Sequence, residues 1–124
     1  MTNVGGTLAV AAVVFVVAPS WRAAPALPLA RGEVAAATVQ GEVAVVGGFV
    51  ADGSSSRRVD LYSPKSSNWR RAADLPVAVN HTFAAGGGGR LYVAGGYGSD
   101  GLLRAAWVRE PGGWRQLPPL PDPD

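Results

Sequence analysis

The chain has 124 residues, of which 17 are glycine, 10 are proline and none is cysteine. A chain of this length and composition forms one small domain or part of one. Without cysteine it has no disulfide, thiol nucleophile or zinc–thiolate site. The formal net charge is +2, and the arginines are spread along the chain. Because they form no basic run interleaved with aromatic residues, we expect no nucleic-acid partner.

The N-terminal segment, residues 1–20, carries no charged side chain, and Leu8–Ala18 is continuously apolar. This length fits the hydrophobic region of a secretory signal, ~7–15 residues, and is short for a membrane span of ~20 residues. Ala18-Pro19-Ser20 and Ala24-Pro25-Ala26 have the small residues of a cleavage site. We therefore predict a hydrophobic leader, a signal peptide or an anchor, and a secreted, periplasmic or membrane-anchored protein. The alternative is a remnant strand at Val13–Val17.

After the leader, the sequence predicts a unit of four short strands. Two apolar runs flank the turn Gln40-Gly41, which is typical of a β-hairpin. The next strand alternates apolar and polar residues, as a half-buried strand does, and turn residues at Ser63–Asn68 separate it from the last strand. The predicted strands are Glu33–Val39, Glu42–Val46, Val59–Tyr62 and a strand that begins at Trp69.

A second unit follows in the same order. The glycines of Gly86–Gly89 are followed by a strand pattern rather than a helix, so we interpret them as a hairpin turn and not as a phosphate-binding loop. The predicted strands of this unit are Thr82–Ala85, Leu91–Ala94, Leu102–Val108 and a strand that begins at Trp114.

The two units share landmarks at a fixed interval. Gly47-Gly48 returns 48 residues later as Gly95-Gly96, and Trp21 returns 48 residues later as Trp69. The pairs Leu27-Pro28 and Leu75-Pro76, and Asp52-Gly53 and Asp100-Gly101, are also 48 residues apart. Tyr62 stands seven residues before Trp69, as Trp107 does before Trp114. A period of ~50 residues indicates a repeat architecture, and four short strands per unit indicate a propeller blade.

These residues resemble the kelch repeat, in which a Gly-Gly doublet ends the second strand and a Trp stands seven residues after a Tyr. The resemblance implies an all-β fold, with two four-stranded antiparallel blades of an incomplete propeller after the leader. We place the repeats in residues 21–124, with blades at 27–74 and 75–116 and the start of a third unit at 117–124. The repeat landmarks are Gly47, Gly48, Tyr62, Trp69, Gly95, Gly96, Trp107 and Trp114.

Two blades are too few for a closed propeller, which has 4–8. Three explanations are open: the chain is a fragment of a longer gene product, it self-associates so that three copies supply six blades, or it is a degraded reading frame. Exposed blade faces would favour association.

One surface concentrates polar loop residues. In an antiparallel unit, the loop after the second strand and the link that follows the fourth strand emerge at the same end. Loops on a rigid scaffold commonly bind ligands, although Asp-Gly pairs also form turns for purely geometric reasons. We name this predicted binding surface the loop face, comprising Arg31, Asp52, Asn80, His81, Tyr97, Ser99 and Asp100.

No catalytic constellation is visible. His81 is the only histidine, and no spacing supplies it with partners for a metal site or a catalytic triad. We predict no metal and no cofactor. The leading hypothesis is a non-enzymatic binding module whose loop face holds a protein or a carbohydrate. The alternatives are a fragment of a propeller enzyme, such as the sialic-acid epimerases with kelch blades, and a truncated chain without its own function. The only polar pair that favours the enzyme is Arg31 and Glu33.

Overall fold

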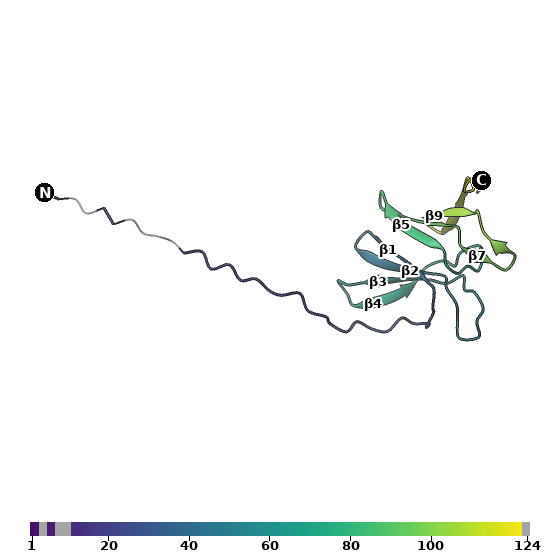
Figure 1. Ribbon diagram of the computed structural model, residues 1–124, viewed down its shortest axis with the longest axis horizontal. Helices are drawn as coiled ribbons and strands as arrows, with labels where there is room; N and C mark the ends of the chain where they lie inside the picture. Colours follow the sequence, from purple (N-terminus) through teal and green to yellow (C-terminus); the bar gives the residue numbers. More distant parts are fainter. Residues whose placement is uncertain (3–4, 7–10, 123–124) are drawn as a thin grey trace.

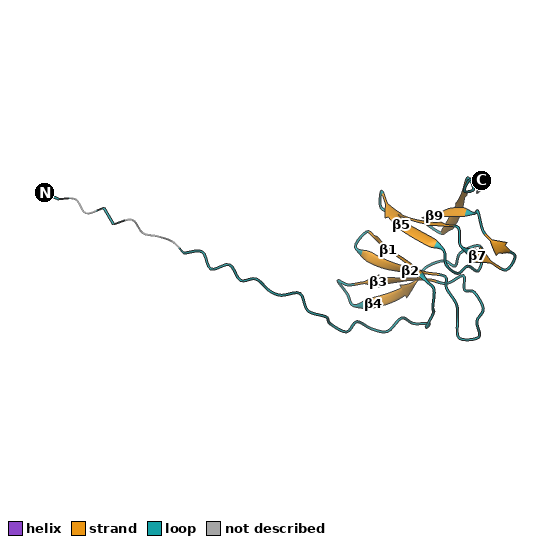
Figure 2. Cartoon of the chain, viewed as in Figure 1, coloured by secondary structure: helices purple, strands orange, loops and turns teal. Residues whose placement is uncertain are grey.

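The computed structural model describes residues 1–2, 5–6 and 11–122. The described part contains strands and no helix (Figure 2). Two open four-stranded antiparallel sheets stand next to each other, one per unit (Figure 1). The first consists of β1 (Ala35–Val39), β2 (Glu42–Val46), β3 (Val59–Ser63) and β4 (Asn68–Arg71). The second consists of β5 (Phe83–Gly87), β6 (Arg90–Ala94), β9 (Ala106–Glu110) and β10 (Gly113–Leu117). The predicted all-β fold with two blades is confirmed.

The first hairpin of each blade turns in two residues. The φ angles are 48° and 76° at Gln40 and Gly41, and 55° and 75° at Gly88 and Gly89. Positive φ at both positions is the mark of the type I′ turn, whose twist suits a two-residue hairpin. The predicted four-glycine turn is therefore shorter than expected, because β5 continues through Gly87 in register with β6.

The third strand of the second blade differs from the prediction. Instead of one strand over Leu102–Val108, the chain forms the short β8 (Gly101–Leu102) and then β9. Between them the Leu103 amide donates to the Gly96 carbonyl at 2.8 Å. Since β8 pairs with β7 (Tyr97–Gly98) in a separate hairpin, the loop competes with the blade for the first residues of the expected strand.

The strand register also corrects one correspondence between the blades. Tyr62 lies opposite Trp69, and their ring centroids are 5.0 Å apart. In the second blade the residue opposite Trp114 is Arg109, whereas Trp107 lies opposite Gln116. The predicted equivalence of Trp107 with Tyr62 is wrong, because the turn between β9 and β10 is two residues shorter than the turn between β3 and β4. The residue seven positions before Trp114 therefore does not occupy the strand position of the residue seven positions before Trp69.

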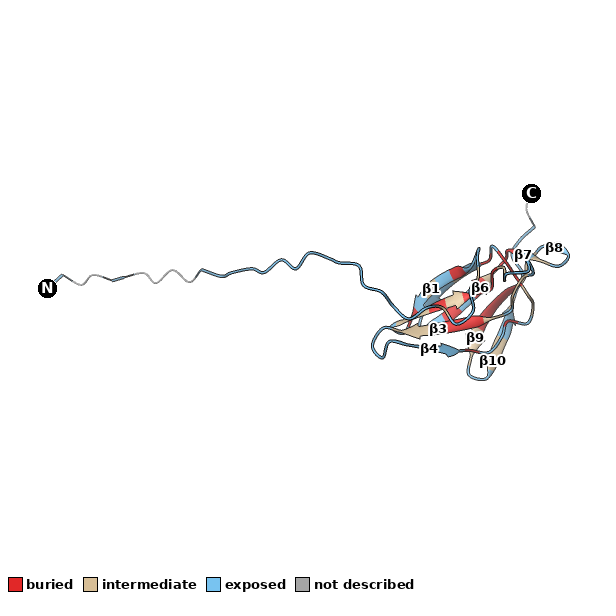
Figure 3. Cartoon of the chain, turned by 90° about the horizontal axis from the view of Figure 1, so that it is seen from below, coloured by how far each residue is buried: buried red, intermediate tan, exposed pale blue. Residues whose placement is uncertain are grey.

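The core lies between the two blades and consists of buried residues from both sheets. Figure 3 colours the buried residues red on strands of each sheet. Leu61 and Val46 on one sheet and Leu91 and Val93 on the other have at most 1% of their surface exposed. At the closest approach, Gly86 faces the Thr38 carbonyl oxygen, and an added Cβ would collide with that oxygen. Glycine at this position therefore allows β1 and β5 to pack tightly.

The segments on either side of the blades were predicted as a leader and as the start of a third unit. Figure 1 shows the described N-terminal residues trailing away from the sheets, and Val13–Val17 is exposed and forms no strand. Residues 3–4 and 7–10 of the predicted leader, and residues 123–124 of the predicted third unit, lie outside the described residues. No helix among the described residues is long and apolar enough to cross a membrane. At the C-terminal side, the Leu120 amide donates to the Arg104 carbonyl at 2.8 Å, as the Leu75 amide does to the Arg57 carbonyl at 2.8 Å.

Candidate functional site

The loops that the sequence assigned to one face do lie side by side. In the first blade the Gly32 and Phe49 backbones exchange hydrogen bonds of 3.0 and 2.8 Å. In the second blade Asn80 and Tyr97 exchange the equivalent bonds at 3.0 and 2.9 Å. Each bond pair joins the link before a blade to the loop after that blade's second strand, so both blades build this end in the same way.

One residue of each link has a left-handed backbone. The φ angle is +50° at Glu33 and +49° at His81, which stands 48 residues later. A positive φ is uncommon for residues other than glycine and costs free energy, so it is informative where it occurs. The two residues also contact each other: the His81 amide donates to the Glu33 carbonyl at 3.2 Å.

His81 is oriented by both of its ring nitrogens. The Asn80 amide nitrogen donates to Ser55 Oγ at 2.8 Å and to the Tyr97 carbonyl at 3.3 Å, which leaves Asn80 Oδ1 as the acceptor for His81 Nδ1 at 2.6 Å. The proton on Nδ1 is assigned from this network. The other nitrogen, Nε2, lies 3.3 Å from the Glu33 carboxylate, and this contact is an ion pair when the imidazole is protonated.

Aromatic rings of both blades flank the imidazole. The Phe49 centroid lies 5.9 Å from that of His81 and the Tyr97 centroid 6.0 Å away, both edge to face. Phe49 and Tyr97 are equivalent residues, 48 positions apart. Since His81 is about half exposed, at 48%, and Tyr97 is 50% exposed, the cluster presents rings and polar atoms to solvent.

Three residues of the predicted loop face stand apart from this cluster. Asp52 Oδ1 accepts from the Ser54 hydroxyl at 2.6 Å and from the Ser54 amide at 2.9 Å, and these bonds, the hydroxyl first, lower the pKa of Asp52. Asp52 therefore shapes its own loop. Ser99 and Asp100 are exposed at the tip between β7 and β8, and within the described part of the chain no hydrogen bond joins them to His81.

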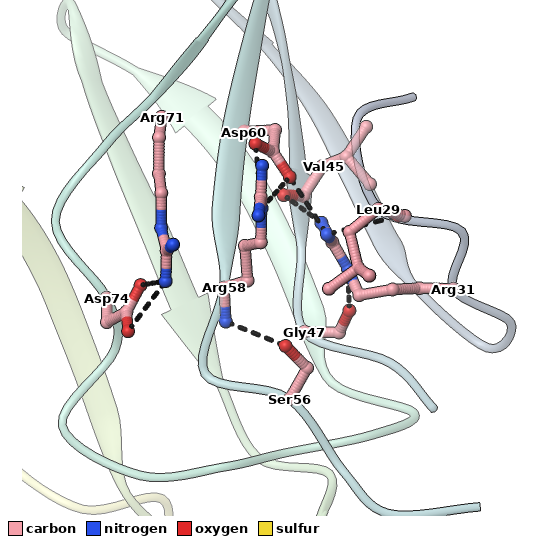
Figure 4. A network of polar contacts seen from close by, with 9 residues as sticks. All are labelled: Leu29, Arg31, Val45, Gly47, Ser56, Arg58, Asp60, Arg71 and Asp74. Carbon is pink, nitrogen blue, oxygen red and sulfur yellow. Dashed lines mark hydrogen bonds and ion pairs between the residues drawn. The ribbon is translucent and has the colours of Figure 1, made fainter. Parts of the chain in front are cut away.

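Arg31, also assigned to the loop face, is directed into the protein (Figure 4). Its side chain is fully buried, and its Nη1 lies 2.8 Å from Oδ2 of the equally buried Asp60. Its Nε donates to the Gly47 carbonyl at 2.7 Å, and Arg58 Nε contacts both oxygens of Asp60 at 3.0 and 2.9 Å. Burial raises the pKa of Asp60, but the hydrogen bonds from Arg58 and Arg31 outweigh it and lower the pKa overall. Arg31 thus anchors the link instead of facing a ligand.

Glu33, Phe49 and Ser55 belong to the cluster but not to the predicted loop face. Glu33 was predicted only as a partner of Arg31, whereas it contacts His81 and Arg31 pairs with Asp60. The period itself carried the signal for two of them, because Glu33 precedes His81 by 48 residues and Phe49 precedes Tyr97 by the same interval. Nothing in the local sequence marks Ser55, which is placed by the fold of its loop against Asn80.

The chemistry available to the cluster is that of recognition. It offers an exposed carboxylate at Glu33, an imidazole, a phenol and the edges of aromatic rings. Aromatic side chains with a polar tip are favoured where proteins contact ligands. Among residues 1–2, 5–6 and 11–122, no group of three or more His, Cys, Asp or Glu side chains is arranged to hold a metal ion.

Comparison with known proteins agrees with this architecture. The family model of the kelch motif matches residues 30–76, which run from the link before β1 to the Leu-Pro pair after β4. The resemblance predicted from the sequence is thus confirmed. No curated protein matches the chain.

Proposed function

We propose that this chain, which carries a kelch motif at residues 30–76, is a non-enzymatic module that binds a protein ligand through the cluster around His81. Kelch-repeat domains are generally non-catalytic interaction modules. Carbohydrate is the other ligand class that such a surface of rings and polar atoms suits, and the experiment below separates the two.

The single observation that supports this proposal is the position of His81 between equivalent aromatic residues of two blades. Structural roles explain most polar loop residues of the chain, such as Asp52 and Arg31. Such structural roles do not explain why exposed side chains, the carboxylate of Glu33 and the imidazole of His81, occupy the equivalent positive-φ positions before the two blades. Strained backbone of this kind gathers at functional sites.

The test screens the full chain against a displayed random-peptide library and, in parallel, an array of immobilised oligosaccharides. We expect saturable peptide binding that weakens about tenfold or more in His81→Asn and Tyr97→Ala, since loss of a central interface anchor often costs ~2 kcal/mol. Asparagine tolerates the left-handed backbone, so His81→Asn removes the ring and keeps the fold.

The matched control is Lys65→Ala, in the exposed turn between β3 and β4. It lies at the opposite end of the blade and should bind like the unmodified chain. Saturable binding to oligosaccharides and not to peptides would indicate that the ligand is a carbohydrate and not a protein. Absence of saturable binding in both screens, or equal binding by all variants, would contradict the proposal.

We further propose that the chain is exported and cleaved after Ser20. The uncharged leader supports export, and the choice of site follows from Trp69, whose indole nitrogen donates to the Pro25 carbonyl at 2.8 Å. Cleavage after Ala26 would remove that acceptor, whereas cleavage after Ser20 keeps it. The mass of the protein recovered outside the cytoplasm of an expressing bacterium should correspond to a chain that starts at Trp21. Retention of the uncleaved chain in the cytoplasm would refute export.

A further inference from the structure

A cleft opens at the end of the blades opposite the loop face, between the two hairpin turns. It has a volume of about 590 Å³, within the ~300–1,000 Å³ common for ligand sites. Its lining includes Gln40 from the first blade and Gly89, Arg90, Arg109 and Glu110 from the second. Because both blades contribute, the cleft exists only where they meet.

The turn backbones bring a neutral donor into the cleft. Gly89 has a φ of +75°, and a Cβ added there would lie 3.0 Å from Gln40 Nε2. The Gln40 amide therefore lies directly against the glycine turn of the other blade. A side-chain amide carries two N–H donors, which can reach a ligand oxygen.

The charges at the cleft are mostly positive. Among the residues that the structure describes, Glu110 is the only acid that lines it, and Glu110 Oε1 is 2.6 Å from Arg115 Nε and 3.8 Å from Arg90 Nη1. The Glu110 carboxylate thus lies between two arginines on one face of the sheet, whereas Arg109, the preceding residue of β9, belongs to the other face, opposite Trp114. Within the described residues Arg109 makes no ion pair closer than 4.0 Å.

The acid of the first blade on which the charge of Arg109 acts is already engaged. Glu42 accepts from Arg70 at 2.7 and 3.2 Å. The pKa of Glu42 is lowered, first by the hydrogen bond from Arg70 and, after its charge, by the charge of Arg109. Arg109 thus acts at a distance on a carboxylate held by another arginine, and Arg109 itself lines the cleft.

We infer that this cleft is a second binding site, which takes a small organic carboxylate between Arg109 and Gln40. The planar guanidinium matches a carboxylate with two parallel hydrogen bonds. The amide of Gln40 supplies a neutral donor from the opposite wall.

The experiment titrates the full chain with succinate, followed by amide chemical shifts and by calorimetry. Succinamide, which has the same shape and no charge, is the control ligand, and inorganic phosphate tests whether any anion suffices. We expect saturable binding of succinate, with shifts at Gly88 and Gly89, and no binding of succinamide. Arg109→Gln should weaken succinate binding about tenfold or more, because it removes a charged hydrogen-bond donor.

Two further variants keep the inference falsifiable if Arg109→Gln alters the fold. Gln40→Glu has the same size, lies in an exposed turn and places a negative charge in the cleft, so it should also abolish binding. Arg57→Gln, an exposed arginine outside the cleft, should bind succinate normally. The inference is overturned if succinate does not saturate, if phosphate binds equally well, or if Arg57→Gln weakens binding as much as the cleft variants.

Discussion

The two blades fill the same position with opposite chemistry. In the first, Asp60 lies opposite Val45 and pairs with the buried Arg31. In the second, the residue opposite the equivalent Val93 is Trp107, and the residue at the place of Arg31 is the fully buried Val79. A charged network and an apolar pair thus support almost the same backbone.

The contrast shows which parts of a blade are constrained. The hydrogen bond from the Gly47 amide to the Arg58 carbonyl, 2.9 Å, returns as the bond from the Gly95 amide to the Ala105 carbonyl, 2.9 Å. The glycine backbone is kept while the side chains around it change from arginine and aspartate to alanine and tryptophan. If one partner of a buried charge pair is replaced, the other is left as an uncompensated buried charge. An apolar pair tolerates replacement of one partner without this penalty.

The largest effect is expected from Asp60→Ala. It leaves the wholly buried Arg31 guanidinium without its carboxylate, which should lower the free energy of unfolding by about 3–5 kcal/mol. Urea unfolding of the full chain, followed by circular dichroism, measures it, with the exposed Asp52→Ala as control. The triple variant Arg31→Val, Arg58→Ala, Asp60→Trp copies the second blade and should recover most of the loss. A triple variant as unstable as Asp60→Ala would show that the two solutions are not interchangeable.

Lowering the pH should reveal the same contribution of Asp60, with a smaller loss of unfolding free energy than Asp60→Ala causes. The pKa of Asp60 in the folded chain lies below its ordinary value of 3.8, because hydrogen bonds from Arg58 and Arg31 outweigh the effect of burial. A depressed folded pKa contributes stability that is present above the unfolded pKa and is lost as pH falls through the folded pKa. Unfolding free energies should therefore decline below about pH 4, and the decline should be shallower in Asp60→Asn. Equal slopes in the two proteins would rule out Asp60 as the source.

Gly86→Ala tests the packing between the blades. The added methyl would collide with the Thr38 carbonyl, and overpacking of a core costs about 1–3 kcal/mol. The matched control is Gly87→Ala on the same strand, where the nearest atom would be Tyr92 Cε2 at 3.8 Å. Equal unfolding free energies for the two variants would contradict the close approach of β1 and β5.

The smallest effects are expected from Trp114→Phe and Trp69→Phe. Each removes an indole donor, whose bond is 2.9 Å to the Ala73 carbonyl or 2.8 Å to the Pro25 carbonyl, and each should cost about 1 kcal/mol. Trp114→Phe should cost more, because that ring also packs against the buried cluster between the blades. The reverse order in chemical denaturation would place the more important anchor in the first blade.

The fold was predictable because its signals are local and repeated. Glycine doublets, two-residue turns and alternating runs specified eight strands of the two blades, and Glu42–Val46 was predicted to the residue. The predictions that failed lie where the second blade has a turn or a loop hairpin that differs from the first, so that the residue spacing of the first blade no longer applies. The short turn at Pro111 and Gly112 displaced Trp107 from the expected position, and the β7–β8 hairpin was hidden inside an apolar stretch.

The binding face was predictable in outline and not in its composition. Strand order alone brought Asn80, His81 and Tyr97 to one end, because that order follows from antiparallel topology. Strand order does not predict which side chains are buried. Arg31 belongs to the link on this face, yet its side chain is directed inward to Asp60. That difference depends on one rotamer and on a partner 29 residues away.

The proposed association of copies into a ring faces one obstacle that the repeat exposes. Thr38 occupies in the first blade the place that Gly86 occupies in the second, 48 residues on. If a second copy stacked its first blade on the second blade as the two blades stack here, the Cβ of Thr38 would meet a backbone oxygen. Self-association therefore stays a prediction that requires a looser packing than the one between these two blades.

The indole hydrogen bonds have a consequence for how the chain is made. Trp69 and Trp114 both donate to carbonyls earlier in the chain, 44 and 41 residues back. A polypeptide leaves the ribosome N-terminus first, so each tryptophan finds its acceptor already synthesised. Each indole bond can thus form as the last strand of its blade emerges, whereas the core between the blades is completed only when the second blade has been made.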